Sequence, residues 1–230
     1  MPEKTKLWYL ENFNLFSNLD EQKMMELNDM ITDRETKANE PIYFAEEPSK
    51  NIYFLKKGKV KITKYMSDGS EKILTVIGPG EIFGEMVYMD EGQRSDYAVT
   101  LEPSLICAIN KNDLAAFIEK NPELNLRFTK LIGLKLRSFS ERVEDLIFKD
   151  AKQRIISFIL RYAEKYGKRV GEQIFIKPFL KHSTLGELTA CSRQTVNYIL
   201  TELRDKKIID FDRSKLVINN LGELKKYVSK

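Results

Sequence analysis

The sequence is poor in residues that bind metals. Its 230 residues include only two cysteines, Cys107 and Cys191, and one histidine, His182. Two thiols exclude a four-cysteine zinc or iron–sulfur site built from this chain alone. Two cysteines so far apart also argue against a disulfide framework. We therefore expect no metal site, and we expect Cys107, in the apolar stretch LICAI, to lie in a hydrophobic core.

The sequence also lacks the segments that direct a chain into a membrane. No run of about 18 apolar residues occurs, so no membrane span is expected. The N-terminal stretch MPEKTKLWYLENF does not have the basic-then-apolar order of a signal peptide. Both observations predict a cytoplasmic protein.

Signs of catalysis are equally scarce. The sequence has no P-loop. Its one histidine and the nearer cysteine, Cys191, are nine residues apart on different predicted turns. A catalytic pair between them would require special geometry, so we expect no catalytic residues and no enzyme activity.

Charge is present but unevenly distributed. Residues 151–230 contain 17 Lys and Arg and 8 Asp and Glu, a net charge of +9, whereas residues 1–150 carry a net charge of −5. A basic C-terminal third on an acidic body predicts contact with a polyanion. The alternative is that the charge is unevenly distributed but contacts only solvent.

Residues from Asn39 to about Asn110 carry β-strand signals. Stretches such as IYFLKKGKVKITKY alternate apolar and polar residues and are rich in β-branched and aromatic types. Many short strands with regular turns predict a β-barrel or jelly roll, preceded by a helix from Asp20 to Thr32. The turn signals are Lys57-Gly58, Asp68-Gly69, Gly78-Pro79-Gly80 and Glu91-Gly92.

A helical period follows from Asp113 to about Phe148. Its later half has apolar residues at alternating spacings of four and three, the pattern of a helix that pairs with a partner helix. We predict that this row forms a two-chain interface. The alternative is packing against the chain's own barrel, which we expect only for Leu124, Phe128 and Leu131. The predicted dimer interface comprises Ile132, Leu136, Phe139, Val143 and Leu146.

The C-terminal part predicts a winged helix-turn-helix. A helix begins at Asp150 and stops at Gly167 in the manner of a C-cap, and a strand covers Gln173–Ile176. Two short helices follow, at 184–190 and 192–206, and then a hairpin around the turn Asp212-Arg213-Ser214. The residues expected to hold the two helices together are Leu185, Leu188, Val196, Ile199 and Leu203.

The second short helix begins with long polar side chains. Ser192 is a good N-cap, and the polar residues Arg193, Gln194, Asn197 and Tyr198 then share one exposed face. In this motif the second helix enters the DNA major groove by its N-terminus, where Arg can read guanine and Gln can read adenine. Ser192 and Thr195 could bond phosphates, as could His182. The alternative is an ordinary polar surface helix.

The segment TLGELTACSRQTVNYILTELRDKKII resembles the DNA-binding region of the cyclic-AMP receptor protein/FNR (Crp/Fnr) family of bacterial transcription regulators. The order of barrel, GEIFGEMVYMDEGQRSDYAV motif, long helix and winged helix resembles the family as well. The resemblance implies an α+β fold with a cyclic-nucleotide-binding-like sensor domain (1–118), a dimerisation helix (119–148) and a winged helix-turn-helix domain (149–230). It also implies a homodimer on palindromic DNA, a signal sensed in the barrel and RNA polymerase as a partner.

The resemblance extends to single residues of the recognition helix. Arg193 matches an arginine that reads guanine in the family. Gln194 stands where many members have a glutamate that accepts from cytosine, and Tyr198 where many have a second arginine. These two departures put the family's best-known half-site in doubt for this chain.

The same family implies a candidate site for a cyclic nucleotide, cyclic AMP included. Gly84, Glu85, Arg94 and Ser95 match its phosphate-binding motif: glycine lets the ligand approach, Arg94 and Ser95 would bind phosphate, and Glu85 would accept from a ribose hydroxyl. The alternative is a structural role, with Glu85 and Arg94 forming an internal ion pair.

Three departures from the family weaken the prediction of a cyclic nucleotide. Asp96 places a carboxylate where a small apolar residue is usual. The loop from Glu85 to Arg94 is one residue shorter than in the cyclic-AMP receptor. The pair that would contact the base, Thr-Ser in that receptor, is Phe139-Ser140 here.

The sequence also allows a different class of function, regulation of a protein partner instead of DNA binding. The chain could be a cyclic-nucleotide-binding module that regulates a protein partner, with its basic C-terminal part as the docking surface. Saturable binding to one palindrome in the presence of competitor DNA would separate the two hypotheses.

Overall fold

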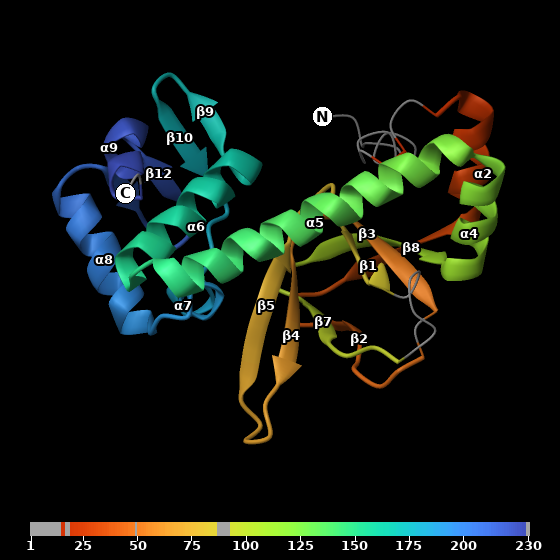
Figure 1. The fold of residues 1–230 in the computed structure, drawn as a ribbon, viewed down its shortest axis with the longest axis horizontal. Coiled ribbons are helices and arrows are strands. Elements are labelled where there is room, and N and C mark those ends of the chain that lie inside the picture. The colour runs from red at the N-terminus through yellow and green to blue at the C-terminus, as the bar shows by residue number, and fades with distance from the viewer. Residues whose placement is uncertain (1–14, 17–18, 49, 87–92, 229–230) are drawn as a thin grey trace. The chain divides into compact units, whose positions relative to one another are not determined.

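The computed structural model describes residues 15–16, 19–48, 50–86 and 93–228. The chain divides into two units, Met1–Leu136 and Arg137–Lys230, and Figure 1 labels most of the helices and strands of each. No helix among the described residues combines the length and the hydropathy needed to span a bilayer.

The first unit is built on two antiparallel sheets of four strands each (Figure 1). They have the strand orders β1-β8-β3-β6 and β2-β7-β4-β5. The prediction of a β-barrel or jelly roll is confirmed in its jelly-roll form, because the described strands make two sheets and do not close into one barrel. The strands are β1 (Ile31–Thr36), β2 (Pro41–Tyr43), β3 (Asn51–Lys57), β4 (Val60–Tyr65), β5 (Glu71–Ile77), β6 (Ile82–Phe83), β7 (Tyr97–Thr100) and β8 (Ser104–Asn110).

The start of the β region lies earlier than the sequence predicts. Helix α2 (Glu21–Met30) ends two residues before Thr32, and β1 begins at Ile31 rather than near Asn39. Four exposed residues separate the two buried ends of β1, so buried and exposed side chains do not alternate along this strand. Its conformation comes instead from pairing with β8 along its whole length, a contact that no local pattern reveals.

Two apolar clusters stabilise the first unit. One packs α2, α4 (Lys111–Lys120) and the start of α5 (Pro122–Phe148) against the sheet that contains β1, and it includes Phe54 and Phe117. Cys107 is fully buried in it, as predicted. The other cluster contains the rings of Tyr43, Tyr53 and Phe83.

The helical region predicted from Asp113 to about Phe148 is confirmed and consists of two helices, α4 and α5. The break occurs at Asn121, which has φ −127° and ψ 76°, because the residue before a proline is disfavoured in the helical region. The prediction that the N-terminal half of this region packs against its own unit is confirmed. Leu124 and Phe128 are buried in the first cluster, and Leu131 packs against it.

The second unit contains α6 (Ala151–Tyr166), which begins with a capping box formed by Asp150 and Gln153. Gly167 ends the helix but not through a left-handed conformation, since its φ is −76°. A glycine is needed there because a Cβ would lie 2.3 Å from the carbonyl oxygen of Ala163. The prediction that Gly167 caps the C-terminus of this helix is confirmed, since its backbone N–H donates to the Ala163 carbonyl.

A four-stranded sheet and three short helices complete the second unit (Figure 1). The strand predicted at Gln173–Ile176 is confirmed, and so is the C-terminal hairpin, in whose turn Asp212 accepts from the backbone N–H groups of Ser214 and Lys215. The remaining elements are β9 (Lys168–Val170), β10 (Gln173–Ile176), β11 (Ile209–Phe211), β12 (Leu216–Ile218), α7 (His182–Thr189), α8 (Arg193–Asp205) and α9 (Leu221–Lys226). The sequence did not predict β9 or α9.

Helices α7 and α8 form the predicted pair. The chain turns between them at Ala190, which adopts a left-handed conformation with φ 51°. All five residues expected to hold the pair together are buried: Leu185, Leu188, Val196, Ile199 and Leu203.

Candidate nucleic-acid interface and sensor cluster

The N-terminus of α8 is capped as the sequence predicts. The Ser192 hydroxyl accepts a hydrogen bond from the Thr195 backbone N–H at 3.0 Å. The two hydroxyls of Ser192 and Thr195 also lie 2.8 Å apart. The cap leaves Arg193 as the first residue of the helix, so its side chain projects from the opening turn.

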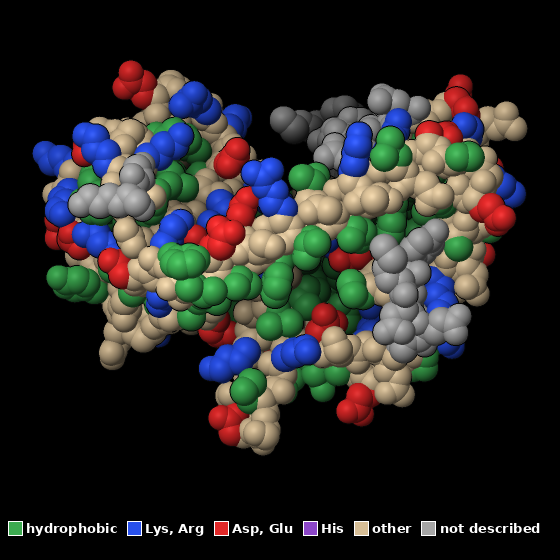
Figure 2. Space-filling view, viewed as in Figure 1, with side chains coloured by type: hydrophobic (Ala, Val, Ile, Leu, Met, Phe, Trp, Pro, Cys, Tyr) green, Lys and Arg blue, Asp and Glu red, His purple; other side chains and the backbone are tan. Residues whose placement is uncertain are grey.

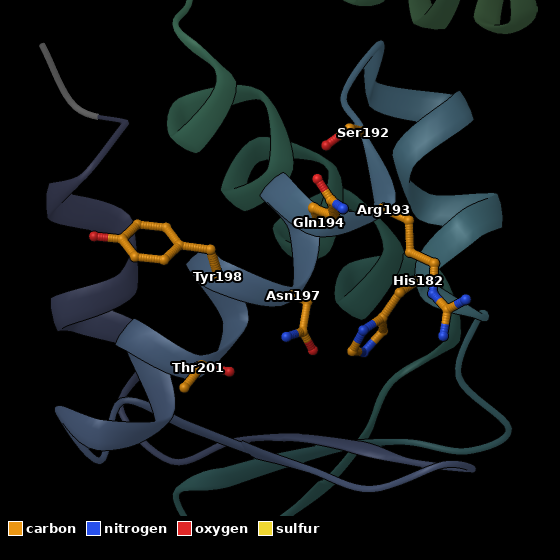
Figure 3. A pocket seen from close by; sticks show the side chains of 7 residues that line it. All are labelled: His182, Ser192, Arg193, Gln194, Asn197, Tyr198 and Thr201. Carbon is orange, nitrogen blue, oxygen red and sulfur yellow. The ribbon is translucent and has the colours of Figure 1, made fainter.

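Polar side chains of α8 line an open depression of about 800 Å³. Arg193, Gln194 and Asn197 are exposed, and Tyr198 is 71% exposed although it is a large aromatic residue. His182 and Ser192 also line the depression, and Figure 3 shows His182, Arg193 and Asn197 close together. Thr201, which the sequence analysis missed, is the seventh lining residue. Its position eight residues after Arg193 on the same helix could have identified it.

His182 connects α7 to the exposed polar face of α8. The imidazole packs edge-on against Phe211 of β11, with ring centroids 5.4 Å apart, and hydrogen-bonds the Asn197 side chain. Burial lowers the pKa of His182, and the nearby Arg193 lowers it further, while the Asn197 hydrogen bond opposes both. Both effects favour the neutral form of the ring in the free protein.

Arg154 of α6 holds the turn between α7 and α8, which the sequence analysis did not anticipate. Its guanidinium donates to the carbonyl oxygens of Thr189 at 2.8 Å and Ala190 at 3.2 Å. It also donates to the Lys149 carbonyl at 2.9 Å. Arg154 thus hydrogen-bonds both the turn between α7 and α8 and Lys149, the residue that directly follows α5.

The C-terminal half of α5 exposes a row of apolar side chains. Leu136, Phe139 and Leu146 are more than half exposed, and Val143 is 37% exposed. Figure 2 shows hydrophobic side chains gathered along this part of α5. Ile132 differs, since it packs partly against the first cluster of its own unit. The row has the exposure that a helix needs if a partner is to cover it.

The same stretch of α5 is joined to α6 by charged groups. Asp145 is buried and pairs with Lys149 at 2.7 Å and with Arg161. Burial alone would raise the pKa of Asp145, but the hydrogen bonds from Arg161 and Lys149 lower it. Within the second unit, these ion pairs fix one face of α5 while the apolar row remains exposed.

The predicted phosphate-binding motif is only partly described, because residues 87–92 lie outside the described residues. The predicted turn Glu91-Gly92 falls in that stretch. Gly84 has a φ of +71°, and a Cβ there would lie 2.9 Å from Arg94 Nη1. The close approach predicted for Gly84 therefore exists, but toward Arg94. Ser95 is exposed.

The charged residues of this motif have partners inside their own unit. Glu85 pairs with Lys135 at 2.7 Å, and Lys135 also donates to the Ile82 carbonyl at 2.6 Å. Arg94 donates to the Asn51 carbonyl at 2.7 Å. The alternative in which Glu85 and Arg94 pair with each other is therefore wrong, because each has a separate partner from a distant part of the chain.

Asp96 and Tyr43 complete the surroundings of Arg94. The Arg94 guanidinium lies 3.8 Å from the centroid of the Tyr43 ring, and the Tyr43 hydroxyl hydrogen-bonds Asp96. Burial raises the pKa of Asp96, while the Tyr43 hydrogen bond and the charge of Arg94 oppose the increase. Burial also raises the pKa of Tyr43, so its hydroxyl remains protonated and is the donor.

Two protein-family descriptions match the two parts of the chain. Residues 33–121 match the cyclic nucleotide-binding domain, and residues 153–227 match the Crp-like helix-turn-helix domain. Together they cover the motif around Arg94 and the face led by Arg193.

Individual relatives match over most of their length. The chain is 31% identical over 178 residues to the cAMP-activated global transcriptional regulator CRP of Pasteurella multocida, which covers 76% of this chain and 83% of the relative. It is 29% identical over 182 residues to the CRP-like cAMP-activated global transcriptional regulator of Mycobacterium tuberculosis, covering 79% and 81%. The structure of FixK2 from Bradyrhizobium japonicum is similar with a TM-score of 0.76 at 20% identity, covering 87% of this chain and 98% of that one. At that identity the structural likeness is evidence for the fold alone.

Proposed function

The chain belongs to the Crp/Fnr family of DNA-binding transcription regulators, and we propose that its α8 reads a palindromic site in double-stranded DNA. The observation that carries this proposal is the group of exposed polar side chains on the first turns of a capped helix: Arg193, Gln194, Asn197 and Tyr198. A helix of a helix-turn-helix enters the major groove with these positions foremost.

The proposed contacts divide into those that specify sequence and those that position the protein. Arg193 is suited to guanine O6 and N7, and Gln194 to adenine N6 and N7. Ser192, Thr195 and His182 border the same face and would bond phosphates, which set the register without reading sequence. Asn197 and Tyr198 lie one turn further along α8 and would contact the next bases.

The proposed active form is a homodimer paired through α5. The row Leu136, Phe139, Val143 and Leu146 follows the spacing of a coiled-coil seam and is exposed in the single chain. A second copy of the same helix is the partner that this spacing fits. Two α8 helices in one dimer would then match the two halves of a palindrome.

The β-rich unit is the sensor in this proposal. A signal that acts on this unit would shift the equilibrium between different packing arrangements of the two α5 helices. That shift would reposition the two α8 helices relative to each other. RNA polymerase is the proposed partner at the promoter. The rival, a module that regulates a protein partner, is not favoured, because the helix-turn-helix match covers the basic C-terminal part.

The proposal can be tested by selection from a library of randomised DNA duplexes, followed by gel shifts with the enriched sequence in excess competitor DNA. We expect enrichment of one palindrome and saturable binding of a protein dimer to it. Enrichment of no sequence, or binding that competitor DNA abolishes equally for every duplex, would refute sequence-specific recognition.

A further inference from the structure

The connection between α5 and α6 consists of Lys149 and Asp150, here called the joint. The angle at the joint decides where the exposed polar face of α8 points relative to the apolar row of α5. We infer that Arg154 is the positioning residue that fixes this angle, so that the pairing of two α5 helices sets the separation of the two α8 helices. The inference rests on the proposed dimer on palindromic DNA and adds the residue that sets the spacing of the half-sites.

The guanidinium of Arg154 reaches both sides of the joint. Its Nε donates to the Thr189 carbonyl at 2.8 Å, and its Nη2 donates to the Ala190 carbonyl at 3.2 Å. Its Nη1 donates to the Lys149 carbonyl, directly after α5, at 2.9 Å. Because a guanidinium is a rigid planar fork, three bonds to three carbonyls fix the directions between those carbonyls as well as their distances.

The end of α7 explains two of the three bonds. The last carbonyls of a helix have no partner within it and interact favourably with a cation. Thr189 is the last residue of α7, and Ala190 is its C-cap. A side chain that only capped α7 would make no bond to Lys149. The third bond therefore indicates a link between the helix-turn-helix and α5.

Further polar contacts hold the α5 side of the joint. The Lys149 ammonium pairs with Asp145 at 2.7 Å and donates to the Ser157 hydroxyl of α6 at 2.8 Å. Asp145 is buried and also pairs with Arg161 of α6. These contacts keep Lys149 in place against both helices, so the carbonyl that Arg154 binds is itself fixed.

The packing of α6 places Arg154 at the joint and holds this helix against α8. The next two residues, Ile155 and Ile156, are fully buried. Lys152 pairs with Glu202 of α8 at 2.6 Å. Apolar packing has no preferred direction, whereas the hydrogen bonds of Arg154 do. The angle between α5 and the helix-turn-helix therefore depends on Arg154 more than on the buried isoleucines.

Distances within one chain test the inference without DNA. Spin labels are introduced through unnatural amino acids at Ser138 of α5 and Asp205 of α8, which are both exposed. The labelled chain is diluted with an excess of the same chain without labels, and double electron–electron resonance then measures the distance between the two labels. We expect one narrow distance distribution when Arg154 is present. Arg154→Met, which keeps a long side chain but removes all its donors, should broaden the distribution or shift its maximum.

Two further variants make the measurement decisive. Arg154→Lys keeps the charge but cannot hold three carbonyls in one plane, so it should broaden the distribution less than Arg154→Met does. Lys165→Ala removes an exposed cation from the last turn of α6 and is the matched control, which should leave the distribution unchanged. An unchanged distribution in both Arg154 variants would overturn the inference, and so would a broad distribution in the chain that retains Arg154.

Half-site spacing provides the functional readout. The selected palindrome is compared with versions that have one base pair added or removed at the centre. The natural dimer should prefer the original spacing by at least about tenfold, and Arg154→Met should reduce this preference by at least about threefold. Its affinity for a single half-site should change by less than about twofold.

The same titrations separate positioning from a merely structural role. A structural defect would weaken binding to the half-site and to every palindrome together and would leave the spacing preference unchanged. That result in Arg154→Met would overturn the inference. If the natural protein bound no palindrome, the proposed function would fail, and the resonance measurement would still decide whether Arg154 fixes the joint.

Discussion

Arg193 projects from the first turn of α8, where a guanidinium can reach a guanine in the major groove. The substitution Arg193→Ala should weaken binding to the selected palindrome by about 1–3 kcal/mol and relax the preference at one base pair in each half-site. Fluorescence anisotropy with duplexes altered one base pair at a time would measure both effects.

Arg169→Ala, on β9 of the same unit, removes the same charge away from α8 and serves as the control. It should leave the base preference unchanged. If Arg193→Ala weakened binding to every duplex equally, Arg193 would be a phosphate contact and base reading would have to be assigned elsewhere.

His182 should make DNA binding depend on pH. Burial and the nearby Arg193 hold the pKa of His182 below its usual value in the free protein, whereas DNA phosphates near an imidazole would raise it. Between the two pKa values of His182, the complex binds one more proton than the free protein. The affinity for DNA should therefore rise as the pH falls through the pKa of His182 in the complex. It should level off once the pH is below the pKa of His182 in the free protein. One proton limits the slope to about tenfold per pH unit.

Anisotropy titrations with the selected duplex at constant salt, repeated across this pH range, would measure the slope. His182→Gln keeps a polar side chain but cannot titrate there, and it should abolish the slope. An unchanged slope in the His182→Gln protein would show that another group takes up the proton.

At the scale of one element, α5 carries the test of dimerisation. Replacing Leu136 and Leu146 together by glutamate would place two carboxylates in the predicted seam. Because burying unpaired charge is costly, the dimer dissociation constant should rise by at least about tenfold and DNA affinity should fall with it. Analytical ultracentrifugation would follow the first change and gel shifts the second.

Ser138→Glu adds a carboxylate to the same helix at an exposed position outside the seam. It should leave the association state unchanged, which separates a seam effect from a general effect of charge. If the double variant remained dimeric at the same concentration, the interface would lie on another surface.

At the scale of the whole molecule, a dimer holds two α8 helices at a fixed spacing. Half-sites of such dimers lie about 34 Å apart, one turn of DNA. Inserting five base pairs at the centre of the palindrome turns one half-site to the opposite side of the duplex, so affinity should fall to that of a single half-site. Replacing central base pairs without changing the length is the control. Equal affinity for both spacings would mean that the two α8 helices bind independently.

Local patterns in the sequence were enough to predict the helix-turn-helix and its exposed face. The Ser192 cap, the buried residues Leu185 and Val196 and the Asp212 turn all depend on residues within a few positions of one another. The break at Asn121 before Pro122 is equally local and could have been read from the sequence. The contacts proposed for Arg193 and its neighbours remain predictions.

Only the tertiary structure decided the rest. The strand β1 exists because it pairs with β8, more than sixty residues further along. Arg94 bonds a carbonyl 43 positions away, and Glu85 is neutralised by Lys135 rather than by Arg94. The sequence by itself therefore determined which residues face outward on α8, because helix periodicity and capping act over one or two turns. It could not determine whether the sensor's charged residues are available to a ligand, because their partners are brought together only when distant strands and helices pack.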